Sequence, residues 1–362
     1  MKKKILALVL CVGLIASFAT ACGNDEGAAG NGSGAAAGNE EVYKFDVSFA
    51  TPEPITVAMT ETFERIEEAS NGRIEFTYYY SWSLSSVNTI IDDFNTGIVD
   101  IGVVPINMHT NLFPYSNLVT DTPFMGIPSM EANTIIYDEL YDEYDVFKAE
   151  FDNAGLHYWT CFANAPYHLF SVGNNAITTP ADLNGVKLMT DDAMLQQYIT
   201  NHGGAPVSSP VTEYATNLNT NVVDGAINHG ATFSAFGCLD FLNSATIFGD
   251  QGILSSIACV CFSQDAWNSL PADLQQLFDD EATNLRDNYT AEVAAMADGA
   301  IQTLVDSGKD IVFLTEEQIA AWSEGFDDIL ADKIAELEKN GATEAQKYYD
   351  IVQDKIAAYP AE

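Results

Sequence analysis

One pattern of apolar and polar positions occurs twice in the chain. In VNTIIDDFNTGIVDIGVV (87–104), apolar residues at helical spacing are followed by an Asn-Thr pair, Gly97 and an apolar run. In VTEYATNLNTNVVDGAIN (211–228), the same order passes through Asn221. Glycine and asparagine accept the left-handed backbone conformation that ends many helices. Each copy therefore predicts a short helix, a cap and a strand. The pair predicts two similar α/β halves, which arose either by duplication or by reuse of a common unit.

Strand-like and helical patterns alternate through the rest of the chain. In the first half, the predicted strands are 42–50, 73–80 and 100–105, with a predicted helix at 55–69. In a second region, which begins near 156, the predicted strands are 186–190, 206–208 and 252–262, with a predicted helix at 192–202. This alternation indicates mainly parallel sheets that are covered by helices.

One long helix is predicted toward the C-terminal end. The segment 271–305 contains no proline after Pro271 and no obvious break, which gives about nine helical turns, on the order of 50 Å. Such a helix is long enough to brace both α/β halves. A predicted strand at 310–314 and further helices as far as Tyr359 follow it.

The N-terminal segment has the features of a bacterial lipoprotein signal. Three lysines precede an apolar run at 5–18, and the small residues Ala-Thr-Ala lead to Cys22. We predict that 1–21 is the signal peptide, that Cys22 becomes the lipid-bearing first residue, and that 22–41 is a flexible tether rich in glycine, alanine and acidic residues. Ordinary signal cleavage beside Ala21 is the alternative. Both routes predict a folded body outside the cytoplasm.

The charge of the chain excludes one class of partner. Its 362 residues include 52 acidic and 14 basic side chains, which give a formal net charge of −38. A chain this acidic repels phosphate backbones, so nucleic acid is excluded as a partner. We interpret the acidity as an aid to solubility outside the cell. The hydrophobic content of 47% is ordinary for a globular protein.

The sequence contains no recognisable motif for catalysis or metal binding. It lacks HExxH, GxSxG, a Walker loop and a Cys-x-x-Cys pair, and its five histidines are scattered. Cys259 and Cys261 are spaced by two in an apolar run, so we expect small buried side chains on one face of a strand rather than a disulfide or a metal pair. We therefore expect a binding protein without a cofactor or metal ion, and not an enzyme.

Six stretches follow one another in a specific order across about 42–285. They are SNGRIEFTYYYSWSLSS, FNTGIVDIGVVP, LFPYSNLVTDTPFM, ITTPADLNGVKL, GGAPVSSPVTEY and NTNVVDGAIN. Together they resemble the DctP-type solute-binding proteins of TRAP transporters. The resemblance implies a periplasmic-binding-protein-like fold of two α/β lobes, with a ligand cleft between the lobes and a long helix that spans both. It also implies that a small organic solute is captured and delivered to the small and large integral membrane subunits of an ion-gradient-driven importer.

The resemblance also implies a division of the body into lobes. Lobe 1 comprises 42–165 and about 254–293, and lobe 2 comprises 166–253 and about 294–362. In a mainly parallel sheet, ligands bind beyond the carboxyl ends of the strands, where the two copies of the pattern end. We therefore predict a cleft that is lined by Phe49, Trp82, Ile106, Asn107, Phe162, Met189, Asn228, His229 and Phe233.

One departure from the family pattern bears on the solute. Where the family usually has an arginine that grips a solute carboxylate with two hydrogen bonds, this chain has Met189. A second basic position of the family falls near Tyr167 and His168, neither of which is reliably charged at neutral pH. We therefore expect a neutral or cationic solute with an apolar face rather than a simple dicarboxylate. Asp191 and Asp192 either meet a cation or begin a helix.

The predicted function is that of a lipid-anchored solute-binding protein, on the outer face of the cytoplasmic membrane or in the periplasm of a Gram-negative cell. Two alternatives stand beside import: a sensor that presents its solute to a signalling receptor, and an extracellular enzyme built on the same fold. Neighbouring genes for a small and a large membrane subunit would favour import. Turnover of a co-purified compound would favour the enzyme.

Overall fold

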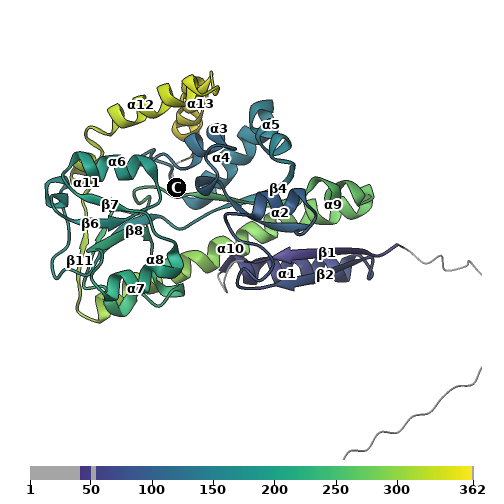
Figure 1. The fold of residues 1–362 in the computed structure, drawn as a ribbon, viewed down its shortest axis with the longest axis horizontal. Coiled ribbons are helices and arrows are strands. Elements are labelled where there is room, and N and C mark those ends of the chain that lie inside the picture. Colours follow the sequence, from purple (N-terminus) through teal and green to yellow (C-terminus); the bar gives the residue numbers. More distant parts are fainter. Residues whose placement is uncertain (1–40, 50–53, 361–362) are drawn as a thin grey trace, which may run out of the picture. The chain divides into compact units, whose positions relative to one another are not determined.

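A computed structural model gives the structure of residues 41–49 and 54–360 (Figure 1). The predicted signal peptide, Cys22 and all of the predicted tether except Glu41 lie outside these described residues. The first predicted strand is described as far as Phe49.

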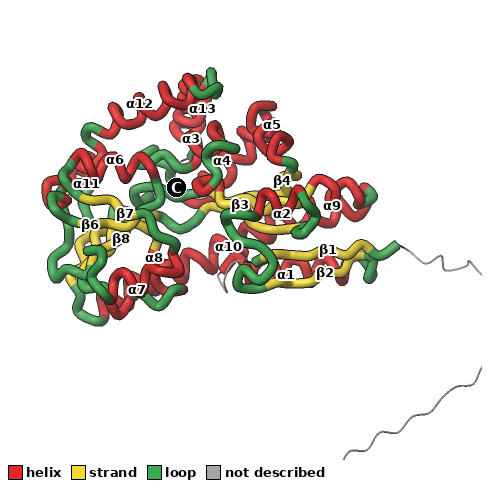
Figure 2. Tube along the Cα trace, in the orientation of Figure 1, coloured by secondary structure: helices red, strands yellow, loops and turns green. Residues whose placement is uncertain are grey.

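The described residues contain two sheets, of five and six strands (Figure 2). The first sheet has the order β2-β1-β3-β10-β4 and comprises β1 (Tyr43–Ser48), β2 (Ile74–Tyr79), β3 (Ile101–Pro105), β4 (Leu156–Ala163) and β10 (Ile257–Ser263). The second sheet has the order β11-β9-β5-β8-β6-β7 and comprises β5 (Tyr167–Ser171), β6 (Lys187–Met189), β7 (Ala205–Val207), β8 (Gly225–His229), β9 (Ser244–Ile247) and β11 (Asp310–Phe313). Every strand that the sequence predicts lies in one of these sheets, whereas β4, β5 and β9 were missed.

One described strand in each sheet runs against its neighbours. β10 pairs antiparallel with β3 and β4, and β5 pairs antiparallel with β8 and β9. Both strands follow a crossing of the chain between sheets, because β4 leads to β5 and β9 leads to β10. Each crossing leaves one sheet at the carboxyl end of a strand and enters the other sheet at the facing edge, so the next strand runs in the opposite direction. The sheets are therefore mainly, but not wholly, parallel.

Helices flank both sheets (Figure 1). The longer helices are α1 (Pro54–Ala69), α4 (Met130–Glu143), α5 (Asp145–Ala154), α6 (Ala193–Asn201), α10 (Ala272–Asp306), α12 (Phe326–Lys339) and α13 (Ala345–Ala358). The shorter ones are α2 (Ile90–Asn95), α3 (Pro114–Thr120), α7 (Tyr214–Asn219), α8 (Gly230–Ala235), α9 (Gln264–Ser269) and α11 (Glu316–Ser323). Short turns of 3-10 helix among the described residues are η1 (Ile106–Met108), η2 (Pro180–Leu183), η3 (Val211–Glu213) and η4 (Leu239–Phe241).

The two copies of the repeated pattern form equivalent structures. The first copy gives α2 and β3, and the second gives η3, α7 and β8. The residues predicted to cap the helices, Gly97 and Asn221, have φ angles of 73° and 54°, in the left-handed region. The first helix begins at Ile90 rather than at Val87, and the second opens with a 3-10 turn. The order of helix, cap and strand is therefore confirmed in both copies.

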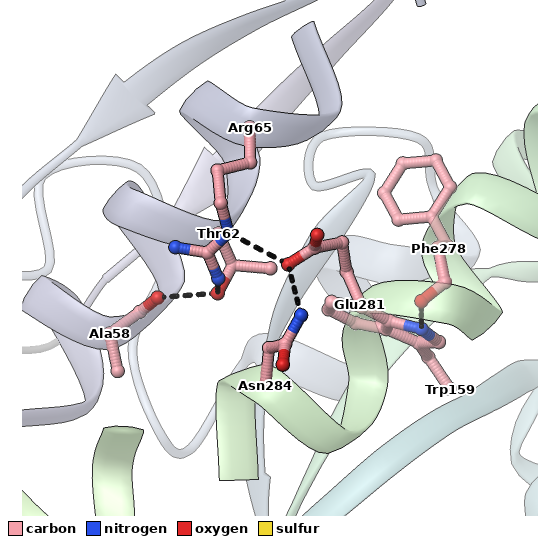
Figure 3. Close-up of polar contacts among 7 residues, drawn as sticks. All are labelled: Ala58, Thr62, Arg65, Trp159, Phe278, Glu281 and Asn284. Carbon is pink, nitrogen blue, oxygen red and sulfur yellow. Dashed lines mark hydrogen bonds and ion pairs between the residues drawn. The ribbon is translucent and has the colours of Figure 1, made fainter. Parts of the chain in front are cut away.

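The predicted long helix is α10, whose 35 residues contact elements of both sheets. Near its N-terminal end, Phe278 packs in the core of the first sheet, and its carbonyl oxygen accepts a hydrogen bond from Trp159 Nε1 at 2.9 Å (Figure 3). Near its C-terminal end, Leu304 packs in a core of the second sheet. The helix therefore braces both sheets, as its length predicts.

All three arginines of the chain form ion pairs that involve α10. Arg65 of α1 pairs with Glu281 of α10 at 2.8 Å (Figure 3). Arg73 pairs with Asp273 at the start of α10 at 2.5 Å. Arg286, on α10 itself, pairs with a carboxylate of α4. Each guanidinium is therefore engaged in holding the long helix against elements of the first sheet.

The last helix packs with the first sheet. Tyr348 and Val352 of α13 are buried in the core cluster that contains residues of α4, α5 and β4, and α13 contacts α3 and α4. The prediction assigned 294–362 to lobe 2, so the packing of this helix departs from it. The remaining boundaries of the two lobes stay a prediction.

Candidate functional site

The strands that end the two copies meet at one cavity. Asn107 lies in η1, directly after β3, and Asn228 lies on β8. Both line a cavity of about 30 Å³. The other lining residues are Asp121, Tyr167, Thr190, Asp191, Asp192, Ile227, Leu254 and Ser256. Elements of both sheets therefore contribute to one site, at the carboxyl ends of β3, β6 and β8.

The Asn228 side chain is oriented by its oxygen atom. The residue is 8% exposed, and its Oδ1 accepts hydrogen bonds from the backbone N–H of His229 at 2.8 Å and from Thr232 Oγ1 at 3.1 Å. Its Nδ2 donates a long hydrogen bond of 3.5 Å to Tyr214 Oη. Because the oxygen is occupied, the amide nitrogen is the group that remains for a solute.

Asp121 is the most deeply buried ionisable group at the cavity. It follows α3 and is 1% exposed. Its Oδ2 accepts hydrogen bonds from Asn117 Nδ2 at 3.1 Å and from Thr120 Oγ1 at 3.0 Å, while its Oδ1 has no hydrogen-bond partner within the described part of the chain. Burial raises the pKa of Asp121 to about 8, and the nearby charge of Asp192 adds to this shift.

Asp191 and Asp192 line the cavity from the second sheet. Asp192 caps α6, where its Oδ1 accepts the backbone N–H of Leu195 at 2.6 Å. Burial raises its pKa to about 6, against the effect of that hydrogen bond and of the Lys333 charge. Asp191 accepts a hydrogen bond from Ser208 Oγ at 3.0 Å, and burial raises its pKa as well. The sequence left open whether this pair meets a cation or begins a helix. Asp192 begins helix α6, whereas Asp191 does not.

A hydrogen-bond network ties the cavity wall to both chain crossings. Tyr167 Oη lies 3.0 Å from Ser256 Oγ, which also accepts a hydrogen bond from Asn164 Nδ2 at 2.9 Å. Asn164, between β4 and β5, accepts in turn a hydrogen bond from Tyr289 Oη of α10 at 2.6 Å. The two crossings and the long helix thus meet beside the cavity.

Five of the predicted cleft residues are buried in hydrophobic cores and do not line this cavity: Phe49, Ile106, Phe162, Met189 and Phe233. Met189 and Phe233 share a core of the second sheet and are 0% exposed. Phe162 lies 4.2 Å, between ring centroids, from Tyr289. Apolar side chains near strand ends here fill the cores, so their contact with a solute stays a prediction.

The remaining two predicted residues lie in other surroundings. His229 lines a second cavity, of about 40 Å³, together with Thr232 and Tyr289. Trp82 has a φ of 57°, and its backbone N–H donates to the Phe49 carbonyl oxygen at 3.0 Å. Neither residue lines the cavity that Asn107 and Asn228 share.

Sequence reasoning passed over three of the polar residues at the cavity. They are Asp121, Thr190 and Ser256. The one sequence signal for Asp121 is its isolation, because it is the single acidic residue in the run LVTDTPF. Thr190 and Ser256 carry no such signal, since a lone hydroxyl in a strand-like segment is ordinary.

The cavity is acidic, and no lysine or arginine is among the described residues that line it. Within the same described part of the chain, no group of three or more histidine, cysteine or carboxylate side chains has an arrangement suited to a metal ion. No helix within 41–49 and 54–360 has both the length and the apolar character of a membrane span.

A curated relative shares part of this sequence. The 2,3-diketo-L-gulonate-binding periplasmic protein YiaO of Escherichia coli (strain K12) is 23% identical over 169 residues. This alignment covers 46% of the present chain and 50% of the relative, so the match spans about half of the relative's length.

Two solved structures resemble the fold over most of the chain. One is a marine metagenome TRAP solute-binding protein from an unidentified microbe, specific for aromatic acid ligands and bound to 3-hydroxybenzoate. Its TM-score is 0.79 at 20% sequence identity, and the alignment covers 89% of this chain and 100% of that chain. The other is a TRAP periplasmic solute-binding protein of Chromohalobacter salexigens with bound D-glucuronate; its TM-score is 0.74 at 19% identity, with 86% and 99% covered.

These likenesses confirm the predicted two-lobed α/β fold. A family model for bacterial extracellular solute-binding proteins, family 7 (DctP), matches residues 48–337. That match covers most of the sequence and includes every described strand except β1, of which it includes only Ser48. The chain therefore belongs to family 7 of the bacterial extracellular solute-binding proteins, the DctP family.

Proposed function

We propose that this protein captures a small organic solute in the cavity between its sheets and delivers it to the membrane subunits of an ion-gradient-driven TRAP-type importer. The observation that carries the proposal is the meeting of Asn107 and Asn228, from equivalent units of opposite sheets, at one cavity. A solute that contacts both residues favours the state in which the two sides are close together. The TRAP names of the two solved structures, and the acids bound in them, support a role in transport.

The size of the cavity supports capture by motion of the two sides. A volume of about 30 Å³ holds about two water molecules. A ring-sized solute therefore enters only when the walls move apart. The chain crossings beside Asn164 and Ser256, with α10 behind them, are the natural positions for such a hinge.

We further propose that the solute is not a simple dicarboxylate. By the resemblance, Met189 stands where the family usually has an arginine; it is buried in a core, and all three arginines are engaged in ion pairs that involve α10. Leaving a buried charge without its partner costs about 3 to 5 kcal/mol, or roughly a few hundred-fold or more in affinity. Succinate and malate should therefore bind weakly.

The test is to purify the protein from its native host, denature it and identify the released compound by mass spectrometry. The compound, added back at about 100 times its dissociation constant, should reduce the radius of gyration in X-ray scattering and stabilise the fold by roughly 2.7 kcal/mol. It should also be recovered unchanged, because we propose binding without turnover. Tight binding without compaction would contradict capture by two lobes, and submicromolar binding of succinate would contradict the solute class.

We also propose that Cys22 bears the lipid that holds the protein at the membrane. One acyl chain binds a membrane only marginally, whereas two or more hold it firmly. Cys22→Ser should therefore move the protein from the membrane fraction to the soluble fraction, with an unchanged melting temperature. Equal partition of the variant and the wild type would argue against the anchor.

A further inference from the structure

Three carboxylates line the proposed solute cavity, and they approach it from different sheets. Asp121 follows α3, whose residues pack in a core of the first sheet, whereas Asp191 and Asp192 follow β6 of the second sheet. With no basic side chain among the described residues of its lining, the cavity offers no cationic partner to a solute carboxylate. This arrangement disfavours an anionic solute, because its carboxylate would be buried without a counter-ion, beside carboxyl groups that become negative as they ionise.

Asp121 supplies a second and independent observation. Its side chain is 1% exposed and lines the cavity, and its Oδ1 lacks a hydrogen-bond partner within 41–49 and 54–360. Asn117 and Thr120 already satisfy Oδ2. A buried carboxylate oxygen without a donor is costly and rare in folded proteins. The backbone N–H of Ile257 lies close enough to the carboxylate to lower its pKa but does not satisfy Oδ1, so the position of Oδ1 suits a donor that comes from outside the chain.

We infer that the solute carries an ammonium group and that Asp121 is its main counter-ion. The inference rests on the proposed function, since it concerns the solute of the same cavity. An ammonium group offers three donors and no acceptor, which matches the acceptor Oδ1 of Asp121. Asp191 adds a second carboxylate, while Asp192 is partly committed to capping α6. Asn228 Nδ2 donates one long hydrogen bond to Tyr214 Oη, and its other N–H then binds an acceptor, such as a hydroxyl or carbonyl oxygen, elsewhere on the solute.

The groups around Asp121 set a pH dependence for this binding. Asn117 and Thr120 of α3 and the backbone N–H of Ile257 in β10 donate toward its carboxylate. The ionisable groups near it are Asp192 at the start of α6, Tyr167 of β5 and Cys259 of β10. Lys333 of α12 lowers the pKa of Asp192. Burial raises the pKa of Asp121 to about 8, so the free protein holds a proton there at pH 7. An ammonium group binds the ionised carboxylate and displaces that proton. Affinity should therefore increase between pH 6 and pH 8.5, with proton release on binding.

The first test compares the charge class of solutes. The probes are ethanolamine, choline, putrescine and benzylamine, with glycolate, succinate and benzoate as acids, titrated calorimetrically into the full chain. The compound released from the native protein is analysed in parallel. We expect the released compound to contain a cationic nitrogen and at least one amine probe to bind more tightly than every acid. Failure of all the amines, or a released compound without a cationic nitrogen, overturns the inference.

The second test uses matched variants. Asp121→Asn keeps the shape of the side chain and should weaken the best amine on the order of 100-fold, and Asp191→Asn by about 10-fold. Asp354→Asn removes the same charge from an exposed position on α13 and should change the affinity less than twofold. A melting temperature for Asp121→Asn at or above that of the wild type at pH 8 shows that the variant is folded. Equal weakening by Asp354→Asn would indicate a net-charge effect and overturn the assignment of Asp121.

The outcomes also separate this inference from the proposed function. If the released compound is an acid that compacts the protein, solute capture stands and the ammonium class falls. If neither the released material nor any probe changes the radius of gyration, both fall together.

Discussion

The two copies of the helix, cap and strand unit share the way in which they join their sheets. In the first copy, the Asp100 carboxylate accepts the backbone N–H of Asp46 in β1 at 2.8 Å. In the second, the Asp224 carboxylate accepts the backbone N–H of Lys187 in β6, also at 2.8 Å. Each aspartate precedes its strand and binds the neighbouring parallel strand. The aspartate that both units share therefore holds the unit to the backbone of the neighbouring strand.

The tips of the two units differ. After β3, Ile106 is buried in a core and Asn107 reaches the cavity from the turn η1. In the second unit Asn228 reaches it from the strand itself, and His229 begins α8 by accepting the backbone N–H of Thr232 at 3.3 Å. Side chains in the loops and turns at strand ends are not needed to hold the sheet together, so they can differ between the units and can bind a solute. The two units therefore share the aspartate that binds the neighbouring strand, whereas the side chains that they present to the cavity differ.

The interiors of the units differ at one equivalent position. Ile101 begins β3 and Gly225 begins β8, and each lies next to the parallel strand of its sheet. A Cβ atom at position 225 would lie 2.2 Å from the Phe170 carbonyl oxygen. The second unit therefore requires glycine where the first buries an isoleucine, because β5 passes close to β8 there.

Ile101→Gly, which gives the first unit the glycine of the second, has the largest expected effect on the free energy of unfolding. Ile101 is 0% exposed, so Ile101→Gly loses a buried side chain and gains backbone freedom, at a cost of about 4 kcal/mol in the free energy of unfolding. Urea denaturation measures this change. Ile98→Ala in the same unit, at a position that is 45% exposed, is the control and should stay within about 0.5 kcal/mol. A loss below about 2 kcal/mol would contradict the burial of Ile101 in the core of the first sheet.

The reverse substitution should also be unfavourable. Gly225→Ala forces the backbone of β8 away from β5 and should cost about 3 kcal/mol. Gly102→Ala, one residue further along the equivalent strand, is the matched control. Its Cβ would lie 3.3 Å from the side chains of Ile90 and Phe94, which can yield, so the expected loss is about 1 kcal/mol. Equal losses in the two variants would show that the approach of β5 is not the cause.

Truncation of the two tips tests the binding contacts. Asn228→Ala removes an oriented donor from a buried site and should weaken binding of the natural solute by about 2 kcal/mol, or roughly 30-fold. Asn107→Ala, from the less buried tip, should weaken it by about 1 kcal/mol. Titration calorimetry measures both. If only one variant changes the affinity, the two units do not share the solute.

The smallest expected effect is a pH dependence confined to the second unit. Burial lowers the pKa of His229 to about 3, and the neutral ring accepts a hydrogen bond at the start of α8. A histidine whose folded pKa lies below its unfolded value contributes stability that is lost as the pH falls below about 6.5. Pro105 stands at the equivalent position of the first unit.

His229→Gln keeps an acceptor that does not titrate in this range. The stability lost between pH 7 and pH 5 should shrink by about 1 kcal/mol in this variant, a value reduced because the ring is partly exposed. His168, whose pKa burial lowers to about 4, remains in both proteins and supplies the shared part of the loss. Identical pH profiles for the variant and the wild type would exclude His229 as a source.

The site was less predictable from the sequence than the fold. Asn107 and Asn228, which line the cavity, were predicted from the repeated pattern because one comes directly after its strand and the other lies near the end of its strand. Met189 was placed in the cleft by resemblance, yet in this structure it packs in a core beside Phe233. Asp121 was missed because the family-like stretch that contains it, LFPYSNLVTDTPFM, does not indicate which of its side chains faces the cavity.

The sequence by itself determined the features that depend on neighbouring residues. The caps at Gly97 and Asn221, the strands they precede and the unbroken run of α10 follow from spacing and backbone preference, which act over a few residues. The tertiary structure alone decided which strand turns antiparallel, why position 225 excludes a Cβ, and which carboxylates face the cavity. These depend on segments far apart in the sequence, such as Asp121 and β6, whose approach is set by the packing of the whole chain.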